Sequence, residues 1–288
     1  MLRRTRYALI AFLLGLPACV SSASPDATGT GGKRGASGPG GSGGSGTSTA
    51  TAGTDTAEGF SCTSDAEPGD TVVVDGGDFD MGCLDGDSCE DDELPAHKVT
   101  LSTFEIDKLE VTQDQYAACV TGGGCPEPSC AWDCTLGDYP ASCVDWNAAE
   151  SYCTWAGKRL PTEAEWEKAA RGEKGRRYPW GNDEPDCTRT NMAGCGDAPL
   201  PVGSLPDGAS PYGALDMAGN MVELVADIYD ESYYASSPAS DPMGPDTGER
   251  HVGRGGGFLS EAKWQRAAKR DWYDTADQGV SLGFRCAR

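Results

Sequence analysis

Histidine and positive charge are both in short supply in this chain of 288 residues. It holds two histidines, and 23 lysines and arginines stand against 45 aspartates and glutamates. An iron site built from several histidines therefore lacks the ligands it needs, and we expect His97 and His251 in loops or at the surface. The formal net charge of −22 repels phosphate backbones, which argues against nucleic acid as a partner.

Long apolar runs are missing as well. The apolar stretch from Tyr7 to Leu16 is too short for a membrane helix, which needs about 20 apolar residues. Three arginines precede this stretch and Pro17-Ala-Cys19 follows it, which is the order of a secretory signal. We therefore predict a signal peptide over residues 1–18.

The sequence Leu16-Pro-Ala-Cys19 resembles a bacterial lipobox. The resemblance implies that Cys19 carries a diacylglyceryl group, that the chain is secreted across the inner membrane, and that a lipid anchors it in the cell envelope. Val20 is no retention signal for the inner membrane, which favours the outer membrane. Ordinary cleavage nearby is the alternative. Lipidation is favoured because removing Cys19 turns 13 cysteines into an even set suited to disulfides.

Aromatic residues are absent between Val20 and Gly59, where Gly, Ser, Thr and Ala dominate. Such a segment cannot bury enough apolar surface to offset its ordering entropy. We predict that residues 19–59 are the lipidated cysteine and a flexible tether spanning roughly 35 Å on average. Residues 60–288 then form one domain, which is long enough for a sizeable core.

Cys-x-x-Cys pairs are absent from this domain, although it holds every cysteine except Cys19. In a secreted chain these cysteines are expected to be oxidised staples and not zinc ligands. Close pairs such as Cys83 with Cys89, or Cys187 with Cys195, would clip local loops. The full connectivity stays open at this point.

Hydrophobic spacing and capping residues predict an α+β domain with much irregular structure. A strand is expected over Thr100–Asp107 and a last strand over Leu282–Cys286, with long loops and short strands beyond Arg176. Three helices are expected to open at capping pairs, namely Thr112 with Gln115, Asn147 with Glu150, and Thr162 with Glu165. The dense acidic run Glu90–Glu93 is interpreted as a solvated loop, with a calcium-binding loop as the alternative.

One long segment, Cys153–Gly172, resembles the signature helix of the formylglycine-generating enzyme family, also called sulfatase-modifying factors. Further segments match in the family's order: Gly77–Gly82, Glu110–Thr112, Val144–Asn147, Tyr178–Gly181, Gly219–Asn220, Arg254–Gly257 and Gly283–Cys286. The resemblance covers residues 72–288. It implies the family's compact, loop-rich, disulfide-stapled fold, which is related to C-type lectin domains.

The family's copper chemistry is not expected in this chain. Members that make formylglycine oxidise a cysteine of a sulfatase peptide with molecular oxygen and a copper(I) ion held by two thiolates. Both thiolates follow the Arg-Gly-Gly motif, but residues 254–270 contain no cysteine, and Ser260 stands where the first ligand belongs. A neutral hydroxyl is a poor ligand for soft copper(I). An inserted cysteine such as Cys125 or Cys130 reaching this position is the alternative.

The resemblance also carries two disulfides and two calcium loops. One family disulfide would join Cys153 to Cys286, whereas Ala170 and Ala267 occupy the places of the other. Calcium ligands are expected at Asn191, Asn220 and Glu223, because amide and carboxylate oxygens suit this hard cation. The alternative is that Glu223 only caps backbone amides.

These observations favour a tethered binding module for an unknown peptide, glycan or small molecule. Its ligand groove is expected near Ser260, Trp264 and Arg270, although Trp264 would equally suit the core. Alternatives are an enzyme of the same superfamily with different, non-copper chemistry, or a structural envelope protein. A triad of Ser260, His251 and an aspartate lacks the sequence of a nucleophile elbow around the serine.

Overall fold

The computed structural model describes residues 60–84 and 89–288. The predicted signal peptide (residues 1–18), the lipidated Cys19 and the tether (residues 19–59) lie outside the described residues. Within the described ranges, no helix is long and apolar enough to cross a membrane.

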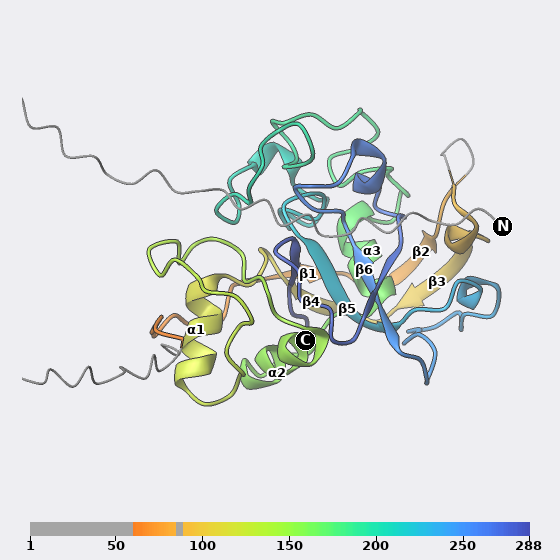
Figure 1. Ribbon diagram of the computed structural model, residues 1–288. Coiled ribbons are helices and arrows are strands. Elements are labelled where there is room, and N and C mark those ends of the chain that lie inside the picture. The colour runs from red at the N-terminus through yellow and green to blue at the C-terminus, as the bar shows by residue number, and fades with distance from the viewer. Residues whose placement is uncertain (1–59, 85–88) are drawn as a thin grey trace, which may run out of the picture. The chain divides into compact units, whose positions relative to one another are not determined.

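The strands of the described residues form three small sheets (Figure 1). Strand β1 (Thr71–Val74) pairs with β4 (Phe104–Asp107), and β2 (Gly77–Met81) pairs with β3 (His97–Leu101), both antiparallel. The third sheet has the order β7-β6-β5-β8, in which only the β5–β8 pair is parallel. Its strands are β5 (Val222–Ile228), β6 (Arg250–Arg254), β7 (Asp271–Asp274) and β8 (Leu282–Phe284).

The expected strand over Thr100–Asp107 is in fact two strand segments, β3 and β4, in different sheets. The strand is interrupted at Ser102, whose N–H and hydroxyl donate to the Asp241 carboxylate at 2.7 and 2.9 Å. This anchor comes from a loop far along the sequence, so local periodicity could not reveal it. The last strand likewise ends at Phe284, before Cys286.

Three α-helices occur in the described ranges, α1 (Gln113–Thr121), α2 (Trp146–Trp155) and α3 (Glu163–Arg171). Both expected capping boxes, at Thr112 and Thr162, are present. Helix α2 starts earlier than predicted, because the Asp145 carboxylate accepts from the Ala148 N–H at 2.9 Å and is the N-cap. Short 3₁₀ turns are η1 (Asp91–Glu93), η2 (Pro206–Gly208), η3 (Tyr233–Ala235) and η4 (Ala262–Gln265).

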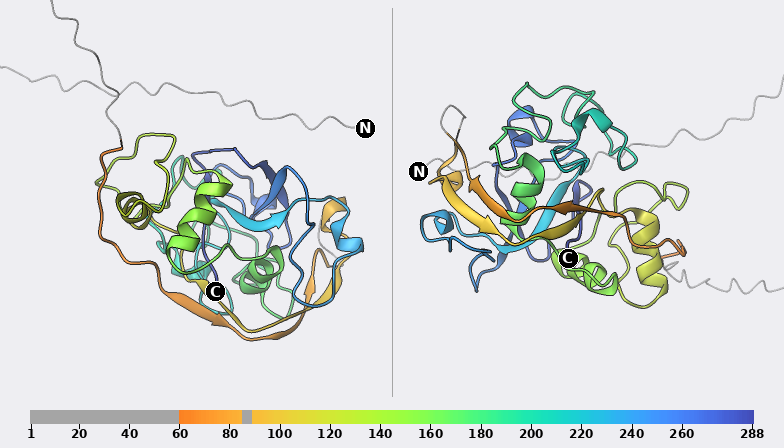
Figure 2. Two further views of the ribbon diagram at one scale, coloured as in Figure 1. Left: turned by 90° about the horizontal axis from the view of Figure 1, so that it is seen from below. Right: turned by 180° about the vertical axis from the view of Figure 1, so that it is seen from behind.

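Helix α3 lies between the β2–β3 pair and the four-stranded sheet, as the views from the front and from behind show (Figures 1 and 2). All nine of its residues are buried. Trp166 and Ala170 on this helix share one core cluster with Ala267 and with side chains of β2, β3 and β6. A second cluster joins α1 and α2 to β8. The mixed, loop-rich α+β fold is thus confirmed.

Six disulfides pair all twelve cysteines of the domain: Cys62–Cys134, Cys83–Cys89, Cys119–Cys125, Cys130–Cys143, Cys153–Cys286 and Cys187–Cys195. The two suggested local clips and the long-range Cys153–Cys286 bond are confirmed. That long-range bond closes a separation of 133 residues, joining α2 to the end of the chain. In the chain-entropy model such a loop is worth about 4–5 kcal/mol.

Candidate functional site

The segment that follows β6, residues 255–265, is here called the Ser260 loop. It begins with Gly255 and Gly256, whose φ angles of +84° and +66° favour glycine. A Cβ on Gly256 would also lie 2.9 Å from the carbonyl oxygen of Trp264. The Ser260 hydroxyl accepts from the Gly257 N–H at 3.0 Å, and the Ser260 N–H donates to the Gly257 carbonyl at 2.8 Å. Ser260 therefore closes a tight turn of its own loop.

Neighbouring segments hold the Ser260 loop in place. The Ala193 N–H donates to the carbonyl of Ser260 at 3.0 Å, and the Phe258 N–H donates to the carbonyl of Asn220 at 2.9 Å. At the end of the loop, buried Gln265 accepts from the hydroxyl of Thr190 at 3.3 Å. The loop is thus attached to the segments around residues 190–193 and 220.

A buried network of ion pairs lies beneath the loop. Arg254, at the end of β6, contacts Glu163 at 3.1 Å and Glu167 at 2.6 Å, and Arg171 contacts Glu167 at 2.8 Å. These side chains are at most 1% exposed. Burial raises the pKa of Glu167, but Arg254 and Arg171 outweigh it, so the pKa lies below its usual value. Glu167 is therefore ionised, and the network fixes the base of the loop against α3.

Arg270 belongs to this network, which corrects the prediction that it lies in a ligand groove. Its guanidinium donates to both oxygens of Glu163 at 2.7 and 3.0 Å and to the carbonyl of Asp92 at 2.8 Å. It also lies 4.3 Å from the ring centroid of Tyr234, and the residue is 0% exposed. The sequence showed a cation near the motif but not the carboxylate 107 residues away that holds it inside.

The acidic run also differs from its prediction as a solvated loop. Glu93 is 0% exposed and accepts two hydrogen bonds from Arg266, at 2.8 and 2.7 Å. Asp92 is buried and accepts from the Tyr229 hydroxyl at 2.7 Å, and Glu90 contacts Lys269 at 3.1 Å. Cations from distant segments pair with Glu93 and Glu90, and a distant hydroxyl donates to Asp92, so the run is not arranged as a calcium-binding loop either.

Ser260 and Trp264 are the two predicted groove residues that reach the surface, and both are partly buried. Trp264 lies on η4 next to two cations, with its ring centroid 4.5 Å from the Lys269 ammonium and 5.9 Å from that of Lys263. Trp264 is therefore neither fully in the core nor free-standing at the surface.

A polar cleft of about 300 Å³ lies between residues 180–189 and the turn η2. Its lining residues combine an aromatic ring, two carboxylates, a hydroxyl and a guanidinium: Trp180, Asp183, Thr188, Arg189 and Asp207. Trp180 stacks on Tyr178 with ring centroids 5.1 Å apart. Arg189 precedes Thr190, which bonds to the Ser260 loop through Gln265. The Tyr178–Gly181 motif could be recognised in the sequence, but the cleft that Trp180 lines could not.

Copper(I) does not fit the residues present. In the described part of the chain every cysteine is in a disulfide, Cys125 and Cys130 included, so no thiolate faces the loop. The Ser260 hydroxyl that stands in place of a ligand is engaged by Gly257. Residues 60–84 and 89–288 also hold no cluster of three or more His, Cys, Asp or Glu side chains suited to a metal.

The side chains predicted to bind calcium form hydrogen bonds and an ion pair with other groups of the protein. Asn191 and Asn220 do meet, with the Asn191 side-chain nitrogen 3.2 Å from the Asn220 side-chain oxygen, and Asn220 also donates to Glu110 at 2.6 Å. Glu223 pairs with Arg285 through both oxygens, at 2.6 and 2.7 Å. These contacts do not fit a calcium site. Glu223 does not serve as the alternative cap of backbone amides either, because its oxygens accept from the side chains of Arg285 and of Trp166, the latter at 2.8 Å.

The two histidines lie in strands, not in loops. His251 in β6 is buried and stacks on Trp146, with ring centroids 4.0 Å apart, and burial lowers its pKa. His97 lies in β3 against Tyr234. The Ser260 hydroxyl bonds to Gly257, and within the described ranges no hydrogen bond joins it to His251. The described residues therefore contain no catalytic triad of Ser260, His251 and an aspartate.

Fold and site together define a loop-rich, disulfide-stapled α+β domain whose loop after the Arg-Gly-Gly motif carries a serine and no thiolate. Residues 58–288 match the family model of the sulfatase-modifying factor enzyme 1-like domain. The chain therefore belongs to this family, as the sequence motifs indicated.

Relatives of this chain include enzymes. It is 34% identical, over 280 aligned positions, to a formylglycine-generating enzyme of Thermomonospora curvata, covering 75% of this chain and 92% of the relative. It is 31% identical to a hercynine oxygenase of Mycolicibacterium smegmatis, over 76% of this chain and 61% of that protein. The solved structure of PvdO from Pseudomonas aeruginosa is 28% identical and superposes with a TM-score of 0.67, covering 80% of this chain and 98% of PvdO.

Proposed function

We propose that this protein is an envelope-tethered lipoprotein whose domain binds a ligand and does not carry out thiolate–copper oxidation. In this proposal Cys19 carries the lipid in the outer membrane, and residues 20–59 hold the domain away from the membrane surface. The ligand site comprises the Ser260 loop, Trp264 included, and the cleft lined by Trp180 and Asp207.

One observation carries the proposal: the twelve cysteines of the domain are all paired, while Ser260 is bound within its own turn. The loop that would hold copper is nevertheless rigidly supported by Arg254 and α3. A supported loop, and a cleft whose Arg189 directly precedes the loop-bound Thr190, together offer aromatic, anionic and cationic side chains that suit recognition of a polar ligand such as a peptide, glycan or small molecule.

The first experiment separates binding from family oxidation. The secreted chain carrying Cys19→Ala, loaded with copper(I), is incubated in air with a sulfatase peptide that contains the target cysteine. We expect no formylglycine by mass spectrometry, whereas conversion of the cysteine would refute the proposal. A parallel capture of labelled envelope extracts should yield a defined ligand that Trp180→Ala and Asp207→Asn both release.

An enzyme with different chemistry is the second candidate. It is supported by the relatives, which are named as a formylglycine-generating enzyme and a hercynine oxygenase. The two candidates differ in the fate of the captured ligand. A binding module returns it unchanged in mass, whereas an enzyme converts it over repeated turnovers.

A further inference from the structure

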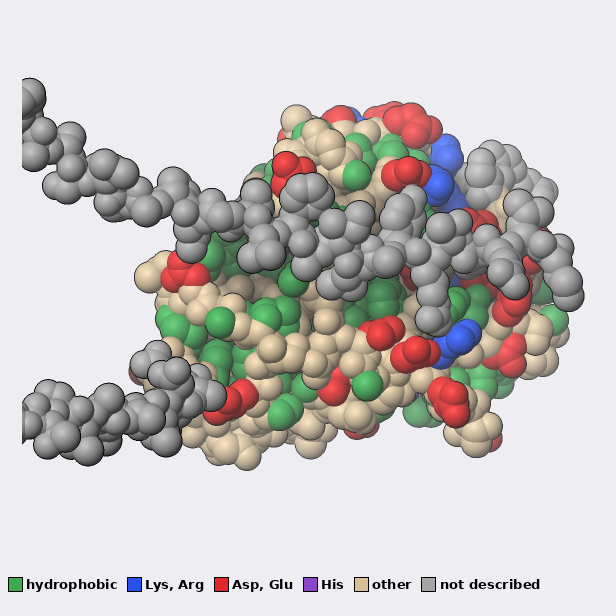
Figure 3. All heavy atoms as spheres, in the orientation of Figure 1, with side chains coloured by type: hydrophobic (Ala, Val, Ile, Leu, Met, Phe, Trp, Pro, Cys, Tyr) green, Lys and Arg blue, Asp and Glu red, His purple; other side chains and the backbone are tan. Residues whose placement is uncertain are grey.

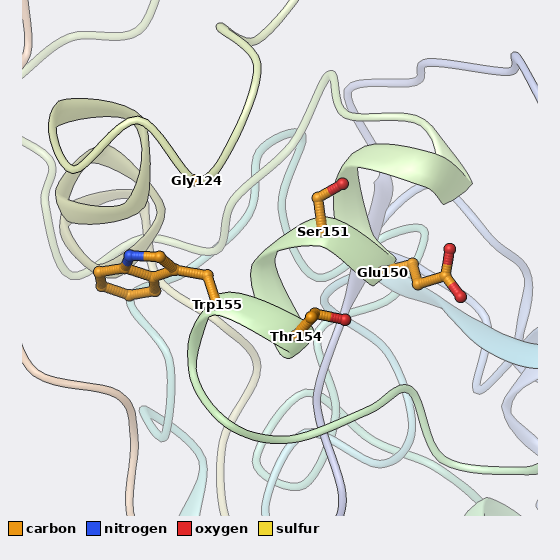
Figure 4. Close-up of a pocket in the computed structure, with 5 residues that line it drawn as sticks. All are labelled: Gly124, Glu150, Ser151, Thr154 and Trp155. Atoms are coloured by element: carbon orange, nitrogen blue, oxygen red, sulfur yellow. The ribbon is translucent and has the colours of Figure 1, made fainter.

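We propose that α2 carries a second binding site, which takes one ring of a neutral oligosaccharide. The site is a pocket of about 370 Å³ between α2 and the turn after α1, lined by Gly124, Glu150, Ser151, Thr154 and Trp155 (Figure 4). It is separate from the Ser260 loop, because α2 packs against α1 whereas the loop is anchored on α3 (Figure 1). The proposal therefore does not depend on the function proposed above.

The indole of Trp155 is held in place but not covered. It lies against the glycine turn that ends α1, where a Cβ on Gly124 would collide with the ring, coming within 2.8 Å of its Cγ. The disulfide Cys119–Cys125 closes this turn. Tyr152 also packs against the indole, with ring centroids 5.8 Å apart. Trp155 is nevertheless 38% exposed, so an aromatic surface is presented with little ordering cost on binding.

Polar groups border this aromatic surface. Glu150 and Thr154 are exposed on α2, one helical turn apart. Ser151 is partly buried, and its hydroxyl donates to the carbonyl of Asn147 at 2.7 Å, which leaves its oxygen able to accept. Figure 4 shows the Trp155 ring pointing toward Gly124, while Glu150 and Thr154 lie on the other side of the pocket.

This arrangement matches the chemistry of a pyranose. Such a ring has an apolar C–H face that packs on an indole and a rim of hydroxyls that bond to carboxylate and hydroxyl oxygens. The volume of about 370 Å³ lies in the range of small-ligand pockets, roughly 300–1,000 Å³. Anionic sugars are disfavoured by Glu150 in the wall and by the net charge of −22. Among sugars, the site therefore favours a neutral one over an anionic one.

The test uses the secreted chain with Cys19→Ala and isothermal titration calorimetry. The probes are maltotriose, cellotriose and N,N′,N″-triacetylchitotriose, with an unsaturated chondroitin sulfate disaccharide as the anionic comparison. We expect at least one neutral trisaccharide to bind and the anionic sugar not to bind. Absence of heat with all three neutral probes, or tighter binding of the anionic one, overturns the proposal.

Variants then assign the binding to this pocket. Trp155→Ala should weaken sugar binding at least tenfold, and Glu150→Gln should weaken it severalfold. The control variant Trp272→Ala, which changes a tryptophan in β7, should leave binding unchanged. Glu150 is exposed, so its variant keeps the test decisive even if removing Trp155 lowers the melting temperature. If the Trp155→Ala and Glu150→Gln variants both bound the sugar as tightly as the chain carrying Cys19→Ala alone, the sugar would bind elsewhere and the proposal would be overturned.

Discussion

Two glutamates of one acidic run should differ sharply in their effect on stability. Glu93 is buried and bonded through both oxygens to Arg266, whose side chain is 4% exposed, whereas the Glu90 side chain is 35% exposed beside Lys269. Replacing Glu93 by alanine removes the buried carboxylate and both hydrogen bonds that it accepts from the Arg266 guanidinium. Replacing Glu90 leaves Lys269 with Glu93 at 3.7 Å and with the carbonyl of Arg270 at 2.7 Å.

The expected magnitudes follow from this difference. Removing one partner of a buried ion pair costs about 3–5 kcal/mol, whereas a partly exposed pair is worth about 0–1 kcal/mol. For a domain of this size 1 kcal/mol corresponds to roughly 2–4 °C in melting temperature. Glu93→Ala should therefore lower the melting temperature by roughly 6–20 °C, and Glu90→Ala by at most about 4 °C.

Guanidinium unfolding followed by tryptophan fluorescence, with the disulfides intact, measures the free energy of unfolding of both variants. Glu90→Ala is the matched control, because it removes the same charge from the same segment. If both variants lost the same free energy, the assignment of Glu93 to a buried pair would be refuted. Double substitution of Glu93 and Arg266 by apolar residues of similar volume should recover part of the loss.

Three further predictions concern the staples, the core and the metal. Replacing Cys153 and Cys286 by alanine should cost about 2–5 kcal/mol of unfolding free energy. Replacing Cys187 and Cys195 should cost less, because the sequence separation falls from 133 to 8 residues. Denaturant unfolding of the two variants measures the difference. Burial raises the pKa of Asp227 from 3.8 to about 8. Since the folded state then binds the proton more tightly than the unfolded state, stability should fall as the pH rises from about 4 to about 8, and Asp227→Asn should flatten this fall in unfolding curves taken across that range. Millimolar calcium should leave the melting temperature equal to that in chelator, and a rise of several degrees would show that the amide and carboxylate oxygens can rearrange into a cation site.

Local signals in the sequence were sufficient for several features. The capping boxes at Thr112 and Thr162 need only residues three positions apart, so they could be predicted without tertiary knowledge. The resemblance of the motifs to the family likewise predicted the fold and the Cys153–Cys286 bond. Short clips such as Cys83–Cys89 follow from proximity in the chain.

Long-range electrostatics could not be predicted in the same way. Helix α3 has an apolar stripe, but Glu163 and Glu167 are also buried, because Arg254 and Arg270 reach them from about 90 to 107 residues away. Charged residues are ordinarily expected at the surface, and only the pairing reverses that expectation. For this reason Arg270 was placed in the groove and the acidic run in solvent.

The candidate site was predicted in part. Replacement of a copper thiolate by Ser260 could be read from the motif, and the structure adds the hydrogen bond that fixes its hydroxyl to Gly257. The cleft around Trp180 could not be read from the sequence, because its residues come from the segment 180–189 and from η2, which meet only in the folded chain.

The central claim is tested most directly by a free-thiol count on the oxidised, secreted chain carrying Cys19→Ala, unfolded without reductant, alkylated and analysed by mass spectrometry. The account predicts that no cysteine between residues 60 and 288 is labelled, because all twelve are paired. Specific labelling of two cysteines, diminished when copper(I) is bound before unfolding, would contradict it and restore thiolate–copper oxidation as the function of this domain.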